Sequence, residues 1–162
     1  MLIIDSTAKI SPFADIEDSV RGTRIEIGER VVIDAFVKIK PAGGCGDVKI
    51  GAYSVVNSGC VIYSGNGVLI GRQVAIAANC TFAPVNHAYQ RRDIPIVKQG
   101  FQPSKGGIEI GDDVWIGANC VFLDGTRVGS GCVIGAGSVV RGVLEGHAVY
   151  GGNPLRMLSR RT

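Results

Sequence analysis

Large apolar residues recur every six positions in the second half of the chain. Between Ile108 and Val140 these positions, here termed anchors, hold Ile110, Ile116, Phe122, Val128, Ile134 and Val140. A small or β-branched residue stands four positions after five of the anchors: Val114, Cys120, Thr126, Cys132 and Ser138. An amphipathic helix repeats every 3.6 residues and a half-buried strand alternates every two, so a period of six fits neither alone.

Tandem repeats of six residues predict short strands that are joined by tight turns and wound into a solenoid. Each anchor is then expected to point inward, above the equivalent anchor of the turn below. Gly directly follows four of the six anchors and lets the backbone turn sharply there. We therefore predict an all-β protein, a parallel β-helix of hexapeptide repeats.

The anchors can be followed from the start of the chain in groups of three. The groups are Ile4, Ile10, Ile16; Ile27, Ile33, Ile39; Ile50, Val56, Ile62; Ile70, Ile76, Phe82; Ile110, Ile116, Phe122; and Val128, Ile134, Val140. Steps inside a group are six residues, whereas the links between groups carry 5, 5, 2, 22 and 0 additional residues. If three hexads form one triangular coil, every insertion leaves the solenoid along the same edge. Before residue 50, Val31 and Val37 could also serve as anchors.

The longest insertion covers about residues 88–109 and follows Asn86 and His87. Loops of this length inside a compact fold are usually functional or disordered. After Val140 the repeat fades, and the stretch from Leu155 to Arg161 is predicted to form a short helical cap within residues 153–161. The whole chain, 1–162, is expected to be one domain.

The composition agrees with a narrow solenoid and excludes several classes of protein. Gly accounts for 24 of 162 residues and aromatic residues for only 6%, which suits many tight turns around a thin interior. A net charge of +3 is too weak to indicate nucleic acid as a partner. Because no long apolar run and no signal peptide are evident, we expect no membrane span and a cytoplasmic location.

The cysteines and histidines are too few and too scattered to predict a metal site. Among five cysteines there is no CxxC pair, and four of them (Cys60, Cys80, Cys120 and Cys132) occupy the small slot four positions after an anchor. Buried, reduced thiols that act as small hydrophobic groups are the expected interpretation. Only two histidines are present, without HxxxH spacing, so no metal centre is predicted.

His87 is the candidate for chemistry because it lies where the regular coil gives way to the longest loop. An imidazole titrates near neutral pH, which suits a general base, although a single His in a loop is also often merely solvated. His147 is expected to be structural or solvated. No Ser-His-Asp or Cys-His pairing can be argued, because four of the cysteines should point into the core.

Several motifs together resemble those of a known family. They are the hexads IGDDVWIGANC and VIGAGSVV, the dipeptide NH before a loop containing RRDIPIVKQGF, and the closing GGNPLRML. In this order they resemble the left-handed β-helix acyltransferases, in particular the maltose-, galactoside- and polysaccharide-type O-acetyltransferases. The resemblance implies a left-handed β-helix and a homotrimer with active sites between neighbouring subunits.

The resemblance also implies a mechanism. His87 would act as general base on an acceptor hydroxyl, which attacks the thioester of acetyl-CoA directly while backbone N–H groups stabilise the oxyanion. A carbonyl or carboxylate on the other ring nitrogen would fix the tautomer, and Asn86 would hold the acceptor or orient His87. No covalent acyl-enzyme is expected.

The family further implies which residues bind the cofactor. Trp115 would lie beside the pantetheine arm, and small residues would line that arm: Gly117, Ala118, Gly135 and Ala136. The family commonly has a Lys at the second position after its GAGSVV motif, whereas this chain has Arg141 one position earlier. Arg141, Arg156 and Arg160 are therefore candidates for the nucleotide and phosphate end.

The resulting hypothesis is acetyl-CoA-dependent O-acetylation of a sugar hydroxyl, within a surface polysaccharide or its precursor. The helical segment that precedes the repeat in the maltose and galactoside enzymes has no counterpart here, which favours the polysaccharide branch. Two alternatives remain open: N-acetylation of a nucleotide-linked amino sugar, and a solenoid that serves as a scaffold without catalysis. The repeat pattern leaves the identity of the acceptor undetermined.

Overall fold

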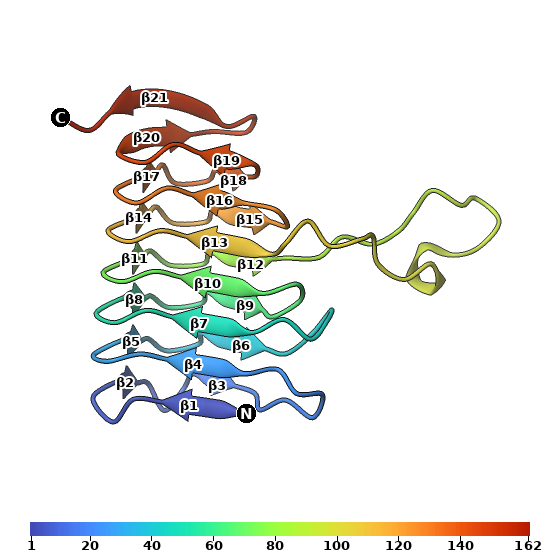
Figure 1. The fold of residues 1–162 in the computed structure, drawn as a ribbon, viewed down its shortest axis with the longest axis horizontal. Coiled ribbons are helices and arrows are strands. Elements are labelled where there is room, and N and C mark those ends of the chain that lie inside the picture. The colour runs from blue at the N-terminus through green and yellow to red at the C-terminus, as the bar shows by residue number, and fades with distance from the viewer.

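The computed structural model describes residues 1–162, and the chain forms a left-handed parallel β-helix with a triangular cross-section. Each coil passes through three sheets, here A, B and C, and consecutive coils stack to form a prism (Figure 1). All strand pairs between coils are parallel, and only the last pair, β20 with β21, is antiparallel. The predicted fold class is confirmed.

The strands are two to five residues long. Sheet A contains β1 (Leu2–Ile4), β4 (Ile25–Ile27), β7 (Val48–Ile50), β10 (Val68–Ile70), β13 (Ile108–Ile110), β16 (Arg127–Val128) and β19 (Val143–Leu144). Sheet B contains β2 (Lys9–Ile10), β5 (Val32–Ile33), β8 (Val55–Val56), β11 (Ala75–Ile76), β14 (Trp115–Ile116), β17 (Val133–Ile134), β20 (Ala148–Gly151) and β21 (Arg156–Arg160). Sheet C contains β3 (Asp15–Ile16), β6 (Lys38–Lys40), β9 (Val61–Tyr63), β12 (Thr81–Ala83), β15 (Val121–Leu123) and β18 (Val139–Val140).

The anchors stack in register, as the period of six predicts. In sheet A, for example, Ile27 pairs with Ile50, which pairs with Ile70, which pairs with Ile110. These anchors are at most 4% exposed and belong to one core of 30 buried residues. Val31 and Val37 are buried as well, in the slots four positions after their anchors. Inward burial of the anchors supplies the main stabilisation of the fold.

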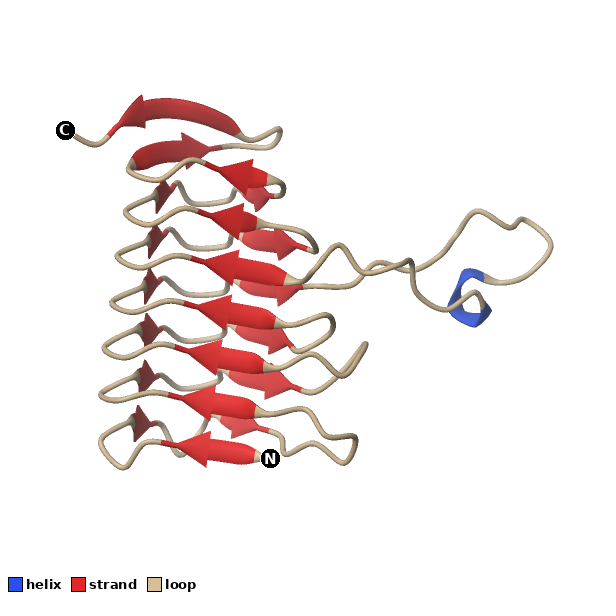
Figure 2. Ribbon diagram, viewed as in Figure 1, coloured by secondary structure: helices blue, strands red, loops and turns tan.

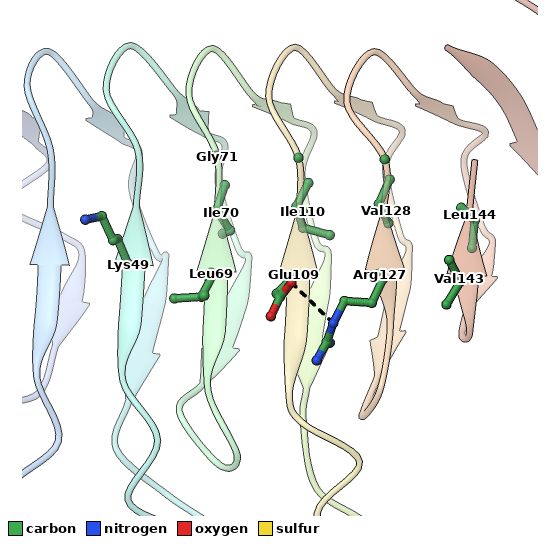
Figure 3. Close-up of a pocket in the computed structure, with 12 residues that line it drawn as sticks. Lys49, Leu69, Ile70, Gly71, Glu109, Ile110, Arg127, Val128, Val143 and Leu144 are labelled. Atoms are coloured by element: carbon green, nitrogen blue, oxygen red, sulfur yellow. Dashed lines mark ion pairs between the residues drawn. The ribbon is translucent and has the colours of Figure 1, made fainter. Parts of the chain in front are cut away.

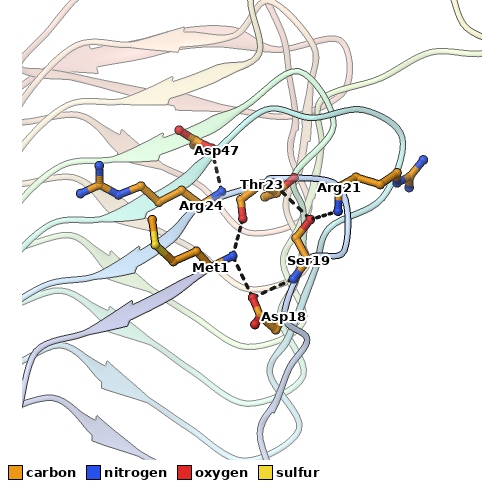
Figure 4. Close-up of polar contacts among 7 residues, drawn as sticks. All are labelled: Met1, Asp18, Ser19, Arg21, Thr23, Arg24 and Asp47. Carbon is orange, nitrogen blue, oxygen red and sulfur yellow. Dashed lines mark hydrogen bonds and ion pairs between the residues drawn. The ribbon is translucent and has the colours of Figure 1, made fainter.

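The first coil lies at one end of the prism, so a neighbouring coil covers it on one side only. Its anchors are consequently less well covered: Ile4 is 43% exposed, and Ile10 and Ile16 are half-buried. Polar contacts hold this end together instead. The Met1 ammonium donates to the Thr23 carbonyl and pairs with Asp18, each at 2.8 Å (Figure 4).

The C-terminal cap differs from the prediction. Residues Arg156–Arg160 form strand β21, not a helix, and β21 pairs antiparallel with β20 across the end of the prism (Figure 2). The last coil leaves the N–H and C=O groups of β20 without a further coil to pair with, and a returning strand satisfies them where a helix could not. The repeat also continues further than predicted, because Leu144 and Tyr150 are buried in the anchor columns.

Every insertion leaves the prism at the edge where sheet C passes into sheet A, as predicted from the spacing. The longest connects β12 to β13 and projects far from the prism (Figure 1). We name residues 84–107 the excursion loop. Its tip carries the only helical turn of the structure, the 3-10 helix η1 (Ile96–Lys98), and no helix is long enough to span a membrane.

Candidate functional site

The excursion loop leaves the prism as two paired limbs. The Ala88 N–H donates to the Gly100 carbonyl at 2.9 Å, and the Gln102 N–H donates to the Asn86 carbonyl at 2.8 Å. His87 and Phe101 lie opposite each other between these bonds. Residues 84–88 are the outgoing limb and residues 101–107 the return limb. This pairing gives the root of the loop a defined geometry even though both limbs lie outside the sheets.

His87 is exposed at this root, four residues beyond the end of β12. Its ring lies against Phe101, with the ring centroids 4.8 Å apart and the planes inclined by 48°. The imidazole makes no hydrogen bond within the chain, so the carbonyl or carboxylate expected on one ring nitrogen is not found there. The contact with Phe101 therefore orients the ring.

A polar groove of about 700 Å³ lies between the loop root and the coil that follows it. Asn86 lines this groove, whereas His87 does not. The other lining residues are Tyr89, Gln102, Lys105, Leu123, Asp124, Gly125, Arg141 and Gly142. Two cationic side chains, two amides and the Asp124 carboxylate line the same space, and because Asp124 already accepts three hydrogen bonds, the two cations favour a polar or anionic ligand.

Arg141 also lines a second cavity, of about 370 Å³, together with Arg156. Residues of the C-terminal cap, Asn153 to Met157, form one wall of this cavity. The structure thus brings together two of the three arginines predicted for the phosphate end. Arg160 is engaged elsewhere, because its guanidinium donates to Glu145 at 2.7 Å.

The residues predicted for the pantetheine arm lie on another side of the prism. Trp115 projects outward from sheet B, 58% exposed, between Ala75 and Val133. Gly117 and Ala118 follow β14 at the corner between sheets B and C, and Gly135 and Ala136 occupy the equivalent corner of the next coil. A Cβ on Gly117 would lie 2.5 Å from the Ala136 nitrogen, so the stacking of these corners requires glycine.

The predicted site residues therefore form two separate groups in one chain. His87, Asn86 and Arg141 lie at the corner between sheets C and A, whereas Trp115 and the small residues lie on sheet B and at the corner beyond it. In Figure 1, β14 and the excursion loop lie on opposite sides of the prism. A single chain does not bring the proposed base and the proposed cofactor-binding residues together.

A third cavity, of about 450 Å³, lies on the outer face of sheet A (Figure 3). Leu69 and Val143 contribute exposed apolar surface there, and Glu109 pairs with Arg127 at 3.3 Å beside them. None of the residues predicted from the sequence to carry chemistry lies in this cavity. It is a feature of the sheet A surface, and Arg127 is the lining residue that also contacts the excursion loop.

The cysteines behave as predicted. Cys60, Cys80, Cys120 and Cys132 are fully buried, and each Sγ donates to a backbone carbonyl at 3.0–3.2 Å. The neighbouring Cys80 thiol and burial raise the pKa of Cys120 well above its usual value, and burial raises the pKa of Cys132. Thiols with a raised pKa are poor nucleophiles, whereas the hydrogen bond with the Cys80 thiol lowers the pKa of Cys60, which is nonetheless fully buried. Cys45 alone is exposed.

Sequence reasoning did not identify Asp124 or Arg127, although both hold the return limb. The Asp124 carboxylate accepts the Lys105 and Gly107 N–H groups at 2.8 Å, and the Arg127 guanidinium donates to the Gly106 and Gly107 carbonyls at 2.9 and 3.1 Å. The dipeptide Asp124-Gly125 signals a turn, but it does not indicate what the carboxylate binds.

Comparison with known proteins agrees with this architecture. The family model described as bacterial transferase hexapeptide (six repeats) matches residues 107–142, the segment with the most regular anchors. The chain carries the hexapeptide repeat of bacterial transferases. Repeats of this kind account for the stacked glycine corners and for the period of six throughout the prism.

Two relatives of known sequence carry names that describe acetyltransferases. The chain is 27% identical over 161 residues to the probable acetyltransferase Rv3034c of Mycobacterium tuberculosis, covering 99% of this chain and 50% of the relative. It is 34% identical over 110 residues to the putative lipopolysaccharide biosynthesis O-acetyl transferase WbbJ of Escherichia coli K12, covering 65% of this chain and 56% of that protein. The chain thus spans little more than half the length of these curated relatives.

One group of solved structures shares nearly the whole fold. A point mutant of AntD, an N-acyltransferase from Bacillus cereus, was solved with dTDP-4-amino-4,6-dideoxyglucose and coenzyme A. It superimposes with a TM-score of 0.81 at 25% identity, covering 99% of this chain and 84% of that chain. The relatives therefore include both O- and N-acyltransferases.

Proposed function

We propose that the protein transfers an acetyl group from acetyl-CoA to a sugar hydroxyl, in a site shared by two subunits of a homotrimer. We propose a surface polysaccharide or its precursor as the acceptor, and the similarity to WbbJ, a putative lipopolysaccharide biosynthesis O-acetyl transferase, supports this class. The observation that carries the proposal is the position of His87. It is exposed at the root of the longest loop, next to a polar groove, on a chain with the transferase hexapeptide repeat.

The outer faces of the sheets support assembly into a trimer. The outward column of sheet B is apolar beyond its first strand: Val32, Val55, Ala75, Trp115, Val133 and Val149. The equivalent column of sheet A carries alternating charges, including Glu26, Lys49, Glu109 and Arg127. An exposed apolar column of this length favours burial against a partner. In the proposed trimer, a second copy packs against sheet B with its His87 corner next to Trp115.

In the proposed reaction His87 removes the proton of the acceptor hydroxyl as its oxygen attacks the thioester carbonyl. The tetrahedral intermediate places negative charge on the former carbonyl oxygen, and backbone N–H donors stabilise it. Collapse breaks the carbon–sulfur bond, and the imidazolium returns its proton to the departing CoA thiolate. The products are an O-acetyl sugar and free CoA. Arg141 and Arg156 would neutralise phosphates of the cofactor.

The main alternative keeps the same cofactor and changes the nucleophile. The similarity to AntD, solved with a nucleotide-linked amino sugar, favours N-acylation of an acceptor of that class. The groove that contains Lys105 and Arg141 also suits a phosphate-bearing acceptor. Identification of the bond formed separates the two, because an O-acetyl ester is cleaved by hydroxylamine at alkaline pH under mild conditions and an amide is not.

The test is release of CoA thiol from acetyl-CoA across free sugars, nucleotide sugars and amino sugars, followed by mass spectrometry of the product. We expect one acceptor class to support turnover and His87→Ala to reduce it by about 10² or more. The matched control is His147→Asn, at a corner where φ is +54° and Asn is tolerated. Turnover that survives His87→Ala would refute the mechanism. An absence of both CoA binding and thiol release would favour a scaffold.

A further inference from the structure

The return limb of the excursion loop is held from both sides of its backbone. Asp124, which is only 7% exposed, accepts the N–H groups of Lys105 and Gly107 and the side-chain amide of Asn66, the last at 3.1 Å. Arg127 donates to the carbonyls of Gly106 and Gly107. Asp124 thus binds N–H groups and Arg127 binds carbonyl groups within the three consecutive residues 105–107. We name this pair of side chains the clamp.

The clamp fits its target closely. Gly107 has φ of +77°, and a Cβ there would lie 2.4 Å from the Gly67 carbonyl oxygen, so only glycine can occupy the position. Charge-assisted hydrogen bonds of this type are shorter and stronger than neutral ones. The carboxylate of Asp124 already has three donors, so its role is to hold the chain in place.

The clamp acts on His87 through the pairing of the limbs. The return limb runs from Phe101 to Gly107, and its first residues face His87 and Asn86 across the loop root. Because the imidazole makes no hydrogen bond within the chain, its orientation depends on the Phe101 ring and hence on where the return limb lies. A shift of the limb would move Phe101, and the ring of His87 with it.

We propose that Asp124 and Arg127 are positioning residues that set the orientation of His87 through the return limb. The role in catalysis rests on the function proposed above. The structural part does not, because it concerns the geometry of the loop root and can be measured without turnover. Neither residue is proposed to contact the substrate through its charged group.

The test uses Asp124→Asn in the full chain, with Asp47→Asn as the matched control. Asp47 also accepts a backbone N–H at the corner between sheets C and A, that of Arg24 at 2.8 Å (Figure 4), and it makes no hydrogen bond to the excursion loop. The chain has only two histidines, so the imidazole signals in a ¹H–¹³C spectrum can be assigned with His87→Ala. Amide exchange of Ala88 and Gln102 reports the limb pairing directly.

We expect Asp124→Asn to shift the His87 signal and to speed exchange of both amides by about 10-fold or more, while the His147 signal stays in place. Asp47→Asn should change none of these. If wild-type turnover is detected, kcat/KM for the acceptor should fall by about 10- to 100-fold with KM for acetyl-CoA unchanged. An unchanged His87 signal and unchanged amide exchange would overturn the proposal, whatever the activity.

A second variant covers the case in which Asp124→Asn does not fold. Arg127→Gln releases the same limb from its carbonyl side, and Lys49→Gln in the same outward column is its control, because Lys49 pairs with Glu26 and not with the loop. The same shift of the His87 signal is expected from Arg127→Gln. If the variants change the signal but leave kcat/KM intact, the link to catalysis is wrong. Failure of the proposed function itself would appear separately, as an inactive wild type.

Discussion

Phe82 and Phe122 stack face to face in the core, with their ring centroids 4.7 Å apart and their planes inclined by only 5°. They are the third anchors of adjacent coils, and both are fully buried. The excursion loop lies between them in the sequence. The core therefore continues across the insertion, and the loop is added without interrupting the stack.

This stack predicts where the fold is most sensitive. Phe122→Ala removes a ring from a site that can collapse little, so we expect it to lower the free energy of unfolding by about 3–5 kcal/mol. Val20→Ala is the control, because Val20 is 99% exposed and should change stability by less than about 0.5 kcal/mol. Equilibrium denaturation in urea measures both values. Equal losses in the free energy of unfolding would show that the buried stack contributes no more stability than an exposed side chain.

The thiols give a second prediction. Cys45 is exposed and the other four cysteines are fully buried, so native protein should react rapidly with one equivalent of an aromatic disulfide reagent per chain. Five equivalents should react after denaturation. Cys45→Ser should abolish the fast phase, whereas Cys132→Ala should leave it intact. A fast phase that survives Cys45→Ser would show that at least one of the other four thiols is accessible in the folded protein.

Most of the fold could be predicted from the sequence because the repeat is local. A six-residue period fixes which residues point inward, and the 22-residue surplus locates the excursion loop. The cap could not be predicted this way. Whether Arg156–Arg160 becomes a helix or a strand depends on the unpaired edge of β20, a tertiary feature that overrides local preference.

Some residues of the candidate site could likewise be predicted from the sequence, and others could not. His87 can be found from the sequence because it lies at the root of an insertion, which the spacing reveals. Asp124 cannot, because its donors are 17, 19 and 58 residues away and no short pattern connects them. The spacing of the anchors also does not reveal that His87 and Trp115 lie apart, because their separation depends on which sheet each hexad joins.

The apolar face of sheet B leads to a prediction about assembly. Val55→Glu places a charge in the middle of this face, and we expect it to convert the proposed trimer to monomers, because an unpaired charge in an apolar interface is costly. Leu69→Glu is the control, since it adds the same charge to sheet A, whose outward column already carries ion pairs. Light scattering after size-exclusion chromatography gives the mass of each variant. A Val55→Glu protein that remains trimeric would place the interface elsewhere.

The division of the site between two corners predicts complementation between inactive subunits. His87→Ala removes the proposed base, and Trp115→Ala removes the proposed contact to the pantetheine arm, so each homotrimer should turn over slowly at acetyl-CoA concentrations below KM. If each site takes His87 from one chain and Trp115 from its neighbour, co-expressed chains that assemble at random should regain about a quarter of wild-type activity. Mixing the two purified homotrimers without exchange of subunits is the control and should restore nothing. Mixed trimers that are verified by mass spectrometry yet remain inactive would contradict a site shared between neighbouring chains, which is proposed because β14 and the excursion loop lie on different sides of one chain.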